Sequence, residues 1–421
     1  MRIYYSLYDQ MLQEQRLLRA FAKVKSNKGA AGIDGQSVTD FTEHLSEEIA
    51  RLVRELKDKS YRPKPVRRVE IPKPDGGIRH LGIPTVRDRV VQQALLDILQ
   101  PIFDPDFHPS SYGYRPGRSC HQAIAKASLF IRRYRRCWVV DMDLSRCFDT
   151  LNHDYIIQQF RRKVVDGSIL RLLQMFLQSG VMTDDGWQAS VLGSPQGGVI
   201  SPLIANVYLD AFDQQMKQRG HRIVRYADDI LILCSSKRGA ENALKVARKH
   251  LEEELRLKVN ERKSQIVHSK DGVRYLGVII ESRYTRLQNE KVRQFKQAVK
   301  RITRRNSSVN LGKVIKDLNP VLRGFANYYR VANCCHQFRE LACWIRRRLR
   351  AKQLSLWKKP KRFHRRLRQL GYQGDIKAIK MCSWRNAASA LANYAMPNGW
   401  LDELGLFDLG RIETGYLPQQ Y

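Results

Sequence analysis

Residues 223–233 constrain the fold more than any other stretch of this chain. The tetrapeptide Tyr226-Ala227-Asp228-Asp229 lies between two apolar runs, residues 223–224 and 230–233. This layout is typical of a strand, a tight turn and a second strand, with two carboxylates at the tip. Adjacent carboxylates suit Mg²⁺, which binds a few hard oxygens together with substrate phosphates. A solvated loop pair is the plain alternative, so the metal site requires a third carboxylate elsewhere.

A strand predicted at residues 137–144 offers that carboxylate. The apolar residues at 140, 142 and 144 share one face, and Asp141 and Asp143 share the other. Two metal ions that join a 3′-hydroxyl to an α-phosphate need carboxylates from more than one segment. The pattern leaves open which of the two aspartates binds metal, because polar residues on an exposed strand face give the same alternation.

The charge of the chain indicates a polyanionic partner. The sequence has 421 residues, a formal net charge of +34 and 43% hydrophobic residues, enough to build cores. Residues 291–368 hold 24 Lys and Arg against two acidic residues, so this stretch is predicted to bind nucleic acid through phosphates. Clustered arginines in it are candidates for contacts with the primer and template: Arg346, Arg347, Arg348 and Arg350.

Cysteine usage and hydropathy point to an intracellular protein. The eight cysteines include no C-x-x-C pair, and the group at 334–343 fits no common zinc module. We expect reduced thiols in a reducing compartment. No apolar run approaches the roughly 18 residues that span a bilayer, and the N-terminus lacks the form of a signal peptide. The expected localisation is cytoplasmic, with no membrane partner.

Helical and strand-like segments alternate as far as about residue 288, which predicts an α+β core. An Asp-Gly pair at 75–76 indicates a hairpin, and helices are expected at 88–100, from 153, at 202–217 and at 240–254. A basic helical module follows, in which Asn319-Pro320 resembles a helix start. The predicted domains are 1–136, 137–288, 289–395 (helical, basic) and 396–421 (tail).

An ordered set of motifs resembles the group II intron reverse transcriptase/maturase family from about residue 15 to 410. The motifs are Gly32-Ile33-Asp34-Gly35, the segment 71–79, Tyr112-Gly113-Tyr114-Arg115-Pro116-Gly117, the segment 143–149, Gly193-Ser194-Pro195-Gln196-Gly197-Gly198, the Asp228 turn, Tyr275-Leu276-Gly277 and the segment 322–329. The resemblance implies an α+β right-hand polymerase, with an N-terminal extension and fingers at 1–136, a palm at 137–288 and a C-terminal α-helical thumb or maturase domain at 289–395. It also implies a bacterial protein that is nucleoid-associated when it acts on DNA. The chain resembles the short members, which lack a nuclease domain.

The resemblance also assigns roles. Asp143, Asp228 and Asp229 would be catalytic, and Mg²⁺, as two ions that Mn²⁺ could replace, would be held by Asp143, Asp228 and the Leu144 carbonyl. Phe148, five residues after Asp143, would exclude the 2′-hydroxyl of a ribonucleotide. The remaining assignments are nucleotide binding by Lys73, Arg79 and Gln196, and primer or template binding by Lys263 and Gly277.

The resulting hypothesis is an RNA-directed DNA polymerase that uses an RNA template, a DNA or RNA primer and dNTPs. It would also bind structured intron RNA and assist splicing and retrohoming. Two alternatives remain open at this point: a reverse transcriptase recruited to phage defence or DNA repair, and an RNA-binding splicing cofactor without polymerase activity. The sequence does not give the oligomeric state or the RNA target.

Overall fold

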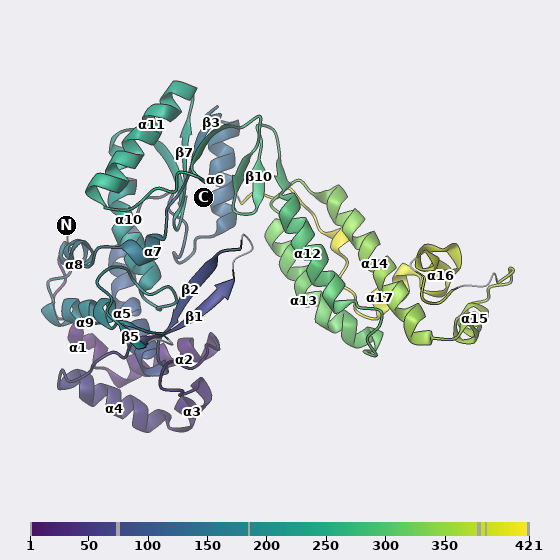
Figure 1. Ribbon diagram of the computed structural model, residues 1–421, viewed down its shortest axis with the longest axis horizontal. Helices are drawn as coiled ribbons and strands as arrows, with labels where there is room; N and C mark the ends of the chain where they lie inside the picture. The colour runs from purple at the N-terminus through teal and green to yellow at the C-terminus, as the bar shows by residue number, and fades with distance from the viewer. Residues whose placement is uncertain (1, 73–75, 184–185, 377–379, 384, 419–421) are drawn as a thin grey trace. The chain divides into compact units, whose positions relative to one another are not determined.

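The computed structural model describes residues 2–72, 76–183, 186–376, 380–383 and 385–418. The chain divides into two compact units, Met1–Val267 and His268–Tyr421 (Figure 1). Among the described helices, none is long and apolar enough to cross a membrane. All eight cysteines are free thiols.

The N-terminal unit begins with helices whose caps the local sequence supplies. Ser37 accepts a hydrogen bond from the backbone N–H of Asp40, whose side chain bonds back to Ser37, the reciprocal capping box of a helix start. Phe21 stacks on Phe41 at 4.9 Å between ring centroids. The helices of this region are α1 (Tyr8–Met11), α2 (Glu14–Ser26), α3 (Val38–Glu43) and α4 (Leu45–Lys57).

A four-stranded sheet in the order β2-β1-β4-β5 follows. Its strands are β1 (Val66–Pro72), β2 (Ile78–Ile83), β4 (Val181–Thr183) and β5 (Gly186–Gln188). β1 and β2 pair antiparallel, with Ile71 opposite Arg79, which confirms the hairpin predicted from the Asp-Gly pair. Lys73, predicted to bind the nucleotide triphosphate, lies outside the described residues.

The second sheet of this unit, in the order β6-β7-β3-β8, carries the predicted metal-binding turn. Its strands are β3 (Trp138–Asp143), β6 (Arg222–Tyr226), β7 (Asp229–Cys234) and β8 (Gln265–His268). Val140, Met142 and Leu144 are buried, whereas Asp141 and Asp143 are partly exposed on the opposite face, as the alternation predicted.

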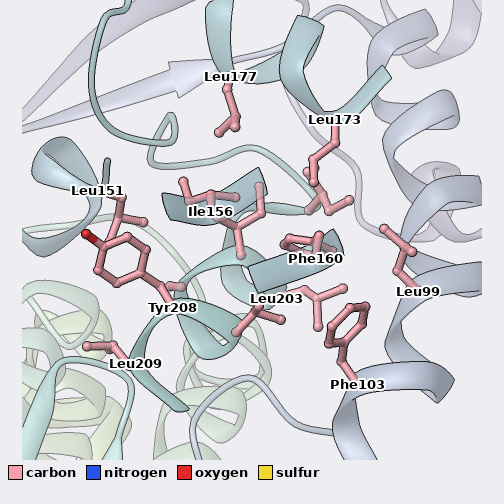
Figure 2. Close-up of a cluster of buried hydrophobic side chains, with 14 of the residues drawn as sticks. Leu99, Phe103, Leu151, Ile156, Phe160, Leu173, Leu177, Leu203, Tyr208 and Leu209 are labelled. Carbon is pink, nitrogen blue, oxygen red and sulfur yellow. The ribbon is translucent and has the colours of Figure 1, made fainter. Parts of the chain in front are cut away.

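Helices of the same unit cover the sheet and form its core. They are α5 (Val86–Phe103), α6 (Cys120–Arg132), α7 (Cys147–Thr150), α8 (His153–Arg161), α9 (Gly167–Gln178), α10 (Ser201–Gln218) and α11 (Lys237–Lys249), with the short turns η1 (Asp104–Asp106) and η2 (His250–Glu254). Figure 2 shows Leu203 and Tyr208 of α10 among side chains of α5, α8 and α9, including Phe103 and Phe160. The four predicted helices are confirmed, with ends shifted by a few residues.

The C-terminal unit joins a three-stranded antiparallel sheet to a set of helices. The strands are β9 (Val273–Tyr275), β10 (Val278–Ile280) and β11 (Thr285–Leu287). The helices are α12 (Asn289–Ile302), α13 (Leu311–Tyr329), α14 (Cys335–Trp357), α15 (Pro360–Gln369), α16 (Ala390–Ala395) and α17 (Asn398–Glu403), with the turns η3 (Asn386–Ala388) and η4 (Leu409–Arg411). The sequence placed a boundary near 288, whereas the compact unit starts at His268 and so includes these strands.

The helix start predicted at Asn319-Pro320 is wrong. α13 runs through both residues and begins instead after Asn310, whose side chain accepts from the backbone N–H of Lys313. Asn319 uses its side chain elsewhere: its Nδ2 donates to the Gly405 carbonyl at 2.7 Å, and its Oδ1 accepts from the Phe407 N–H at 2.9 Å. The apparent cap is therefore a tertiary contact that fixes the C-terminal segment to α13.

Candidate active site and nucleic-acid surface

The β6–β7 hairpin and the end of β3 bring the predicted carboxylates together. Tyr226 pairs with Asp229 across the hairpin, and Asp143 is directly opposite Asp229 in the β3–β7 ladder. Opposed residues of an antiparallel pair point to the same face of the sheet. Asp228 lies in the turn itself, immediately after Ala227, whose φ of +58° is a left-handed backbone conformation. Three carboxylates from two distant segments thus meet at one sheet edge.

Burial and the charges of neighbouring carboxylates raise the pKa of three aspartates in this cluster, Asp141, Asp228 and Asp229. Burial, followed by the charges of Asp141, Asp228 and Asp143, raises the pKa of Asp229 to about 8. Burial and the nearby Asp143 also raise the pKa of Asp228. The pKa of Asp141 is raised to about 6, again by burial first. A bound cation would relieve this repulsion.

The carboxylates of this cluster fit an Mg²⁺ ion that also binds the substrate. Within the described ranges, no group of three or more His, Cys, Asp or Glu side chains has the geometry of a complete metal site. Mg²⁺ commonly binds one or two carboxylates and completes its shell with water and substrate phosphates. Asp143 and Asp228 supply such a partial set of hard oxygens, so the residues fit a metal that arrives with a nucleotide.

The segment after η2 fixes Asp143. The backbone carbonyl of Asp143 accepts from the Asn260 N–H at 2.8 Å, and Asp143 Oδ2 accepts from the Asn260 side chain at 3.2 Å. Lys263, predicted to contact primer or template, lies with Nζ 3.6 Å from Asp143 Oδ2. The next residue, Leu144, is buried and forms an isolated antiparallel bridge with Val259. Lys263 therefore sits beside the carboxylate cluster.

A fully buried arginine holds the turn that carries Asp228. Arg225 forms an ion pair with Asp213, its Nη2 lying 2.6 Å from Oδ2, and both side chains are 0% exposed. Its Nη1 donates to the Asn206 side-chain oxygen and to the Ala227 carbonyl, each at 3.0 Å. Sequence reasoning missed this role, although an arginine inside the apolar run of β6 was a visible signal, since a buried charge requires partners.

The segment 108–115 supports the same turn from the other side. The Tyr112 N–H donates to the Arg225 carbonyl at 2.9 Å, and Asn206 donates to the Gly113 carbonyl at 2.8 Å. A Cβ at Gly113 would lie 2.3 Å from the Ala227 nitrogen, so only glycine permits this approach. The glycine of this motif is thus explained by backbone packing against the catalytic turn.

The predicted nucleotide pocket is partly assembled around the turn. Phe148 is half-buried, and Tyr114 packs edge-on against it with ring centroids 6.3 Å apart. Burial, followed by the charge of Asp228, raises the pKa of Tyr114. Arg79 is exposed on β2, and its charge lowers the pKa of Asp228 against the dominant effect of burial. Tyr114 is a candidate that the sequence motif contained but did not single out.

Gln196 lies on a turn that is attached to β2. Its carbonyl accepts from the Gly82 N–H at 2.7 Å. The following Gly197 has a φ of +114°, and a Cβ there would lie 2.4 Å from the Gly82 oxygen. The turn is therefore fixed against the strand that carries Arg79. Gln196 and Arg79, two of the residues predicted to bind the nucleotide, thus lie on segments that contact each other.

In the C-terminal unit, the predicted contacts with primer and template fall into two groups. Arg346 forms an ion pair with Asp408 at 2.5 Å. Arg348 is buried and donates to the Thr303 hydroxyl at 2.7 Å, and Arg350 is buried and donates to the Met396 carbonyl at 2.9 Å. Arg347 is exposed. Three of these arginines thus contact the module itself in this structure, and their role toward nucleic acid stays a prediction.

Two further features of this unit are the turn at Gly277 and the exposed cations of α15. Gly277 has a φ of +81° in the β9–β10 turn, and a Cβ there would lie 3.0 Å from the Tyr329 hydroxyl. Its contact with primer or template stays a prediction. In α15, Phe363 and Leu367 are buried, whereas exposed cations occupy the opposite face: Lys361, Arg362, Arg365 and Arg368. This face is the most concentrated exposed positive charge on any described helix of the module.

The two families that this chain matches agree with this geometry. Residues 71–280 match the family described as reverse transcriptase (RNA-dependent DNA polymerase), and residues 292–371 match the group II intron maturase-specific domain. Protein YkfC of Escherichia coli is 36% identical over 318 residues, which cover 64% of this chain and 84% of that protein. The group II intron-encoded protein LtrA of Lactococcus lactis is 36% identical over 226 residues, 52% of this chain but only 37% of its own length. A telomerase structure from Candida albicans aligns with a TM-score of 0.44 at 12% identity over 76% of this chain and 64% of that one.

Proposed function

This chain belongs to the group II intron reverse transcriptase/maturase family, and from that membership we propose that it is an RNA-directed DNA polymerase that also binds structured intron RNA. It extends a DNA or RNA primer along an RNA template by adding deoxynucleotides to the primer 3′-hydroxyl. The observation that carries this proposal is the meeting of Asp143, Asp228 and Asp229 at one edge of the β6-β7-β3-β8 sheet.

Asp143, Asp228 and the Leu144 carbonyl would hold divalent metal, most simply Mg²⁺. When bound, two such ions activate the attacking hydroxyl and stabilise the charge on the leaving pyrophosphate. Asp229 lies between Asp143 and Tyr226 in the ladder and keeps the carboxylate cluster in register. Asn260 fixes Asp143 through two hydrogen bonds, so this oxygen donor is already in place before substrate arrives.

The nucleotide is positioned by residues around this cluster. Arg79, and with it Lys73, would bind the triphosphate, because cationic donors offset the charge of a transferring phosphoryl group. Gln196 would contact the nucleotide from its fixed turn. Phe148, held edge-on by Tyr114, would leave no room for a 2′-hydroxyl, which selects dNTP over rNTP by shape.

The maturase role rests on the C-terminal unit. Residues 292–371 match the maturase-specific domain, and the stretch 291–368 carries 24 basic residues against two acidic ones. Such a surface would bind the phosphates of intron RNA and of the template–primer duplex. We propose that it assists splicing and retrohoming of that intron in a bacterial cytoplasm, and acts at the nucleoid when the target is DNA.

Primer extension by Asp228→Asn tests the catalytic assignment. We expect a loss of roughly 10³-fold or more, since losing several kcal/mol of charge stabilisation costs a factor of ten per 1.4 kcal/mol. RNA affinity should be unchanged. Asp154→Asn, an exposed aspartate on α8, is the matched control and should extend normally.

A readout independent of turnover accompanies this test. Mg²⁺ together with a dNTP should raise the melting temperature of the wild-type protein, because the ion relieves repulsion among the carboxylates, and it should do so less for Asp228→Asn. Full extension by Asp228→Asn would overturn the metal assignment. A wild-type protein that promotes intron splicing but never extends a primer would instead favour the splicing-cofactor alternative, and extension without any effect on splicing would favour a recruited polymerase.

A further inference from the structure

A cavity of about 360 Å³ lies in the N-terminal unit, away from the carboxylate cluster. Its walls come from the segment 108–110, from α6, from the chain that follows α6, and from the end of α10 and the start of β6. This volume is within the range of about 300–1,000 Å³ that ligand sites commonly have. The cavity is therefore large enough for a small ligand or for one unit of a polymer.

The cavity is distinct from the polymerase centre. Arg222, at the start of β6, lines it, whereas Tyr226, at the other end of the same strand, adjoins the catalytic turn. Four residues of β-strand separate the two positions by about 13 Å, at about 3.3 Å per residue. A nucleotide paired with the template at Asp228 cannot fill both sites.

Positive charge dominates the lining. Lys126, Arg136, Lys217 and Arg222 contribute cations, and the described residues that line the cavity include no aspartate or glutamate. Lys217 and Arg222 are exposed. Burial, with the charges of Arg222 and Arg118, lowers the pKa of Lys126, which shows that these cations repel one another. An anionic ligand would relieve that repulsion.

Aromatic rings stand beside these cations. Phe130 and Tyr134 have ring centroids 6.0 Å apart, and Lys126 Nζ lies 5.2 Å from the Phe130 centroid. Tyr134 is 56% exposed, so its ring is accessible to a ligand in the cavity. Cations together with an exposed ring are the combination that binds an unpaired nucleotide, because the phosphate pairs with the cations and the base stacks on the ring.

We propose that this cavity binds an unpaired, phosphate-bearing nucleotide of a single-stranded RNA segment. This inference rests on the proposed function, since RNA is the partner that the polymerase and maturase roles supply. The site provides a second point of attachment for RNA, at the far end of β6 from the chemistry. An inorganic phosphate would use the cations alone and would leave the exposed Tyr134 ring without a partner.

Binding of a fluorescein-labelled oligouridine, followed by anisotropy across a series of salt concentrations, tests the charge contribution. For Lys217→Gln/Arg222→Gln we expect the log–log salt slope to flatten by about 1.4, at about 0.7 per phosphate contact to a single strand. The matched control Arg133→Gln/Arg219→Gln removes the same charge from exposed positions next to the cavity that do not line it. Its slope should equal that of the wild-type protein.

The ring is tested separately. Tyr134→Leu should weaken oligouridine binding on the order of tenfold, because base–aromatic stacking is lost, whereas Tyr134→Phe should retain wild-type affinity. A 4-thiouridine oligomer should crosslink to the peptide that contains Tyr134 in the wild-type protein. This measurement needs no variant and so does not depend on variant folding.

The outcomes separate this inference from the proposed function. All variants should extend a preannealed primer at the wild-type rate, since the polymerase centre is untouched. Normal extension with an unchanged slope, or a crosslink confined to other peptides, would overturn the cavity assignment alone. Competition by polyglutamate or inorganic phosphate as effective as that by uridine monophosphate would also overturn it, because the ring would then have no role. A wild-type protein without extension would instead contradict the proposed function.

Discussion

The two units of this protein each contain a fully buried cation, and these two cations have opposite kinds of partner. In the N-terminal unit, Arg225 is fully buried against the carboxylate of Asp213. In the C-terminal unit, Lys352 is equally buried but donates to the hydroxyl and carbonyl of Ser307, and Arg350 donates to the Met396 carbonyl and the Asn398 side chain. The first arrangement cancels the charge, and the second satisfies the hydrogen bonds while leaving the charge in place.

The composition of each region explains this difference. Residues 291–368 contain only two acidic residues, so most of their buried cations can be satisfied only by neutral oxygens. Arg346 is the exception, because the acidic C-terminal segment supplies Asp408. The N-terminal unit therefore uses a buried ion pair to position one turn, whereas the C-terminal unit uses buried cations to join helices and to maintain a positive field toward nucleic acid.

Substitutions that break the two kinds of buried contact should lower the free energy of unfolding by different amounts. Asp213→Asn leaves Arg225 buried without a counter-charge, which should lower the free energy of unfolding by about 3–5 kcal/mol. Arg350→Met removes the cation together with its need for partners, and should cost about 1–2 kcal/mol for the unpaired acceptors left behind. Urea unfolding followed by circular dichroism measures both.

The double variant Arg225→Met/Asp213→Leu is the control for this pair. It removes both charges and should recover much of the stability lost in Asp213→Asn, because no uncompensated ion remains. It should not recover primer extension, since the Ala227 carbonyl loses its donor. Equal costs for Asp213→Asn and Arg350→Met would contradict the distinction between the two units.

The second test asks which cations of the C-terminal unit reach RNA. Replacing the exposed α15 residues Lys361, Arg362, Arg365 and Arg368 by glutamine should flatten the salt slope of RNA binding by about 3, at about 0.7–0.9 per contact. Replacing the buried Arg348 and Arg350 should instead lower stability and change the slope little. Filter binding over a range of KCl concentrations decides between them, and a flatter slope for the buried pair alone would reverse the assignment.

The third test examines whether the fixed geometry of the N-terminal unit extends to substrate choice. Phe148→Val should lower the preference for dNTP over rNTP by on the order of 10²-fold, because the ring that excludes a 2′-hydroxyl is gone while the carboxylates are untouched. Single-nucleotide kcat/KM values for both substrates measure this. Tyr114→Phe keeps the contacting ring and serves as the control. Activity with an unchanged preference would reduce Phe148 to a packing residue.

The smallest effect concerns Asp210 on α10, which forms no ion pair among the described residues. Burial, followed by the charge of Asp213, raises the pKa of Asp210 from 3.8 to about 6. The native protein therefore binds more protons than the unfolded chain between these values, and stability falls as the pH rises from about 4 to 6. Asp210→Asn should stabilise the protein by about 1 kcal/mol at pH 7, after the loss of an acceptor for Gln214.

The pH dependence supplies the internal control for this variant. At pH 4 the wild-type carboxyl is already protonated, so the gain from Asp210→Asn should disappear. Thermal unfolding at both pH values measures the difference. A gain of equal size at both would show that the effect is not one of charge.

Local patterns were enough to predict the strands that carry the site. The alternation at 137–144 fixes a strand and its two faces, and the apolar runs around Asp228 fix a hairpin. The register of Asp143 opposite Asp229 is not local information, because a shift of two residues keeps the same faces. The ion pair of Arg225 with Asp213 could not be predicted, because its partner lies on a different element. Asn319 misled for a related reason: its side chain has the chemistry of a cap but is used in a tertiary contact.

Helix geometry alone separates the arginines of α14 onto different faces. Successive helical residues are rotated by about 100°, so Arg346, Arg347 and Arg348 cannot share one face. Of the three, Arg348 is the one that is buried. Which one is buried depends on the neighbouring helices, and that information is not local.

The contact between Gly113 and Ala227 has a consequence for protein engineering. A side chain at position 113 would collide with the backbone nitrogen of Ala227, and Ala227 itself has a left-handed backbone conformation. Libraries that randomise the catalytic turn alone would therefore sample backbones that the fixed loop rejects. Diversifying both segments as one unit would allow the loop to move away whenever the turn changes shape, and so would open sequence space that neither segment can reach separately.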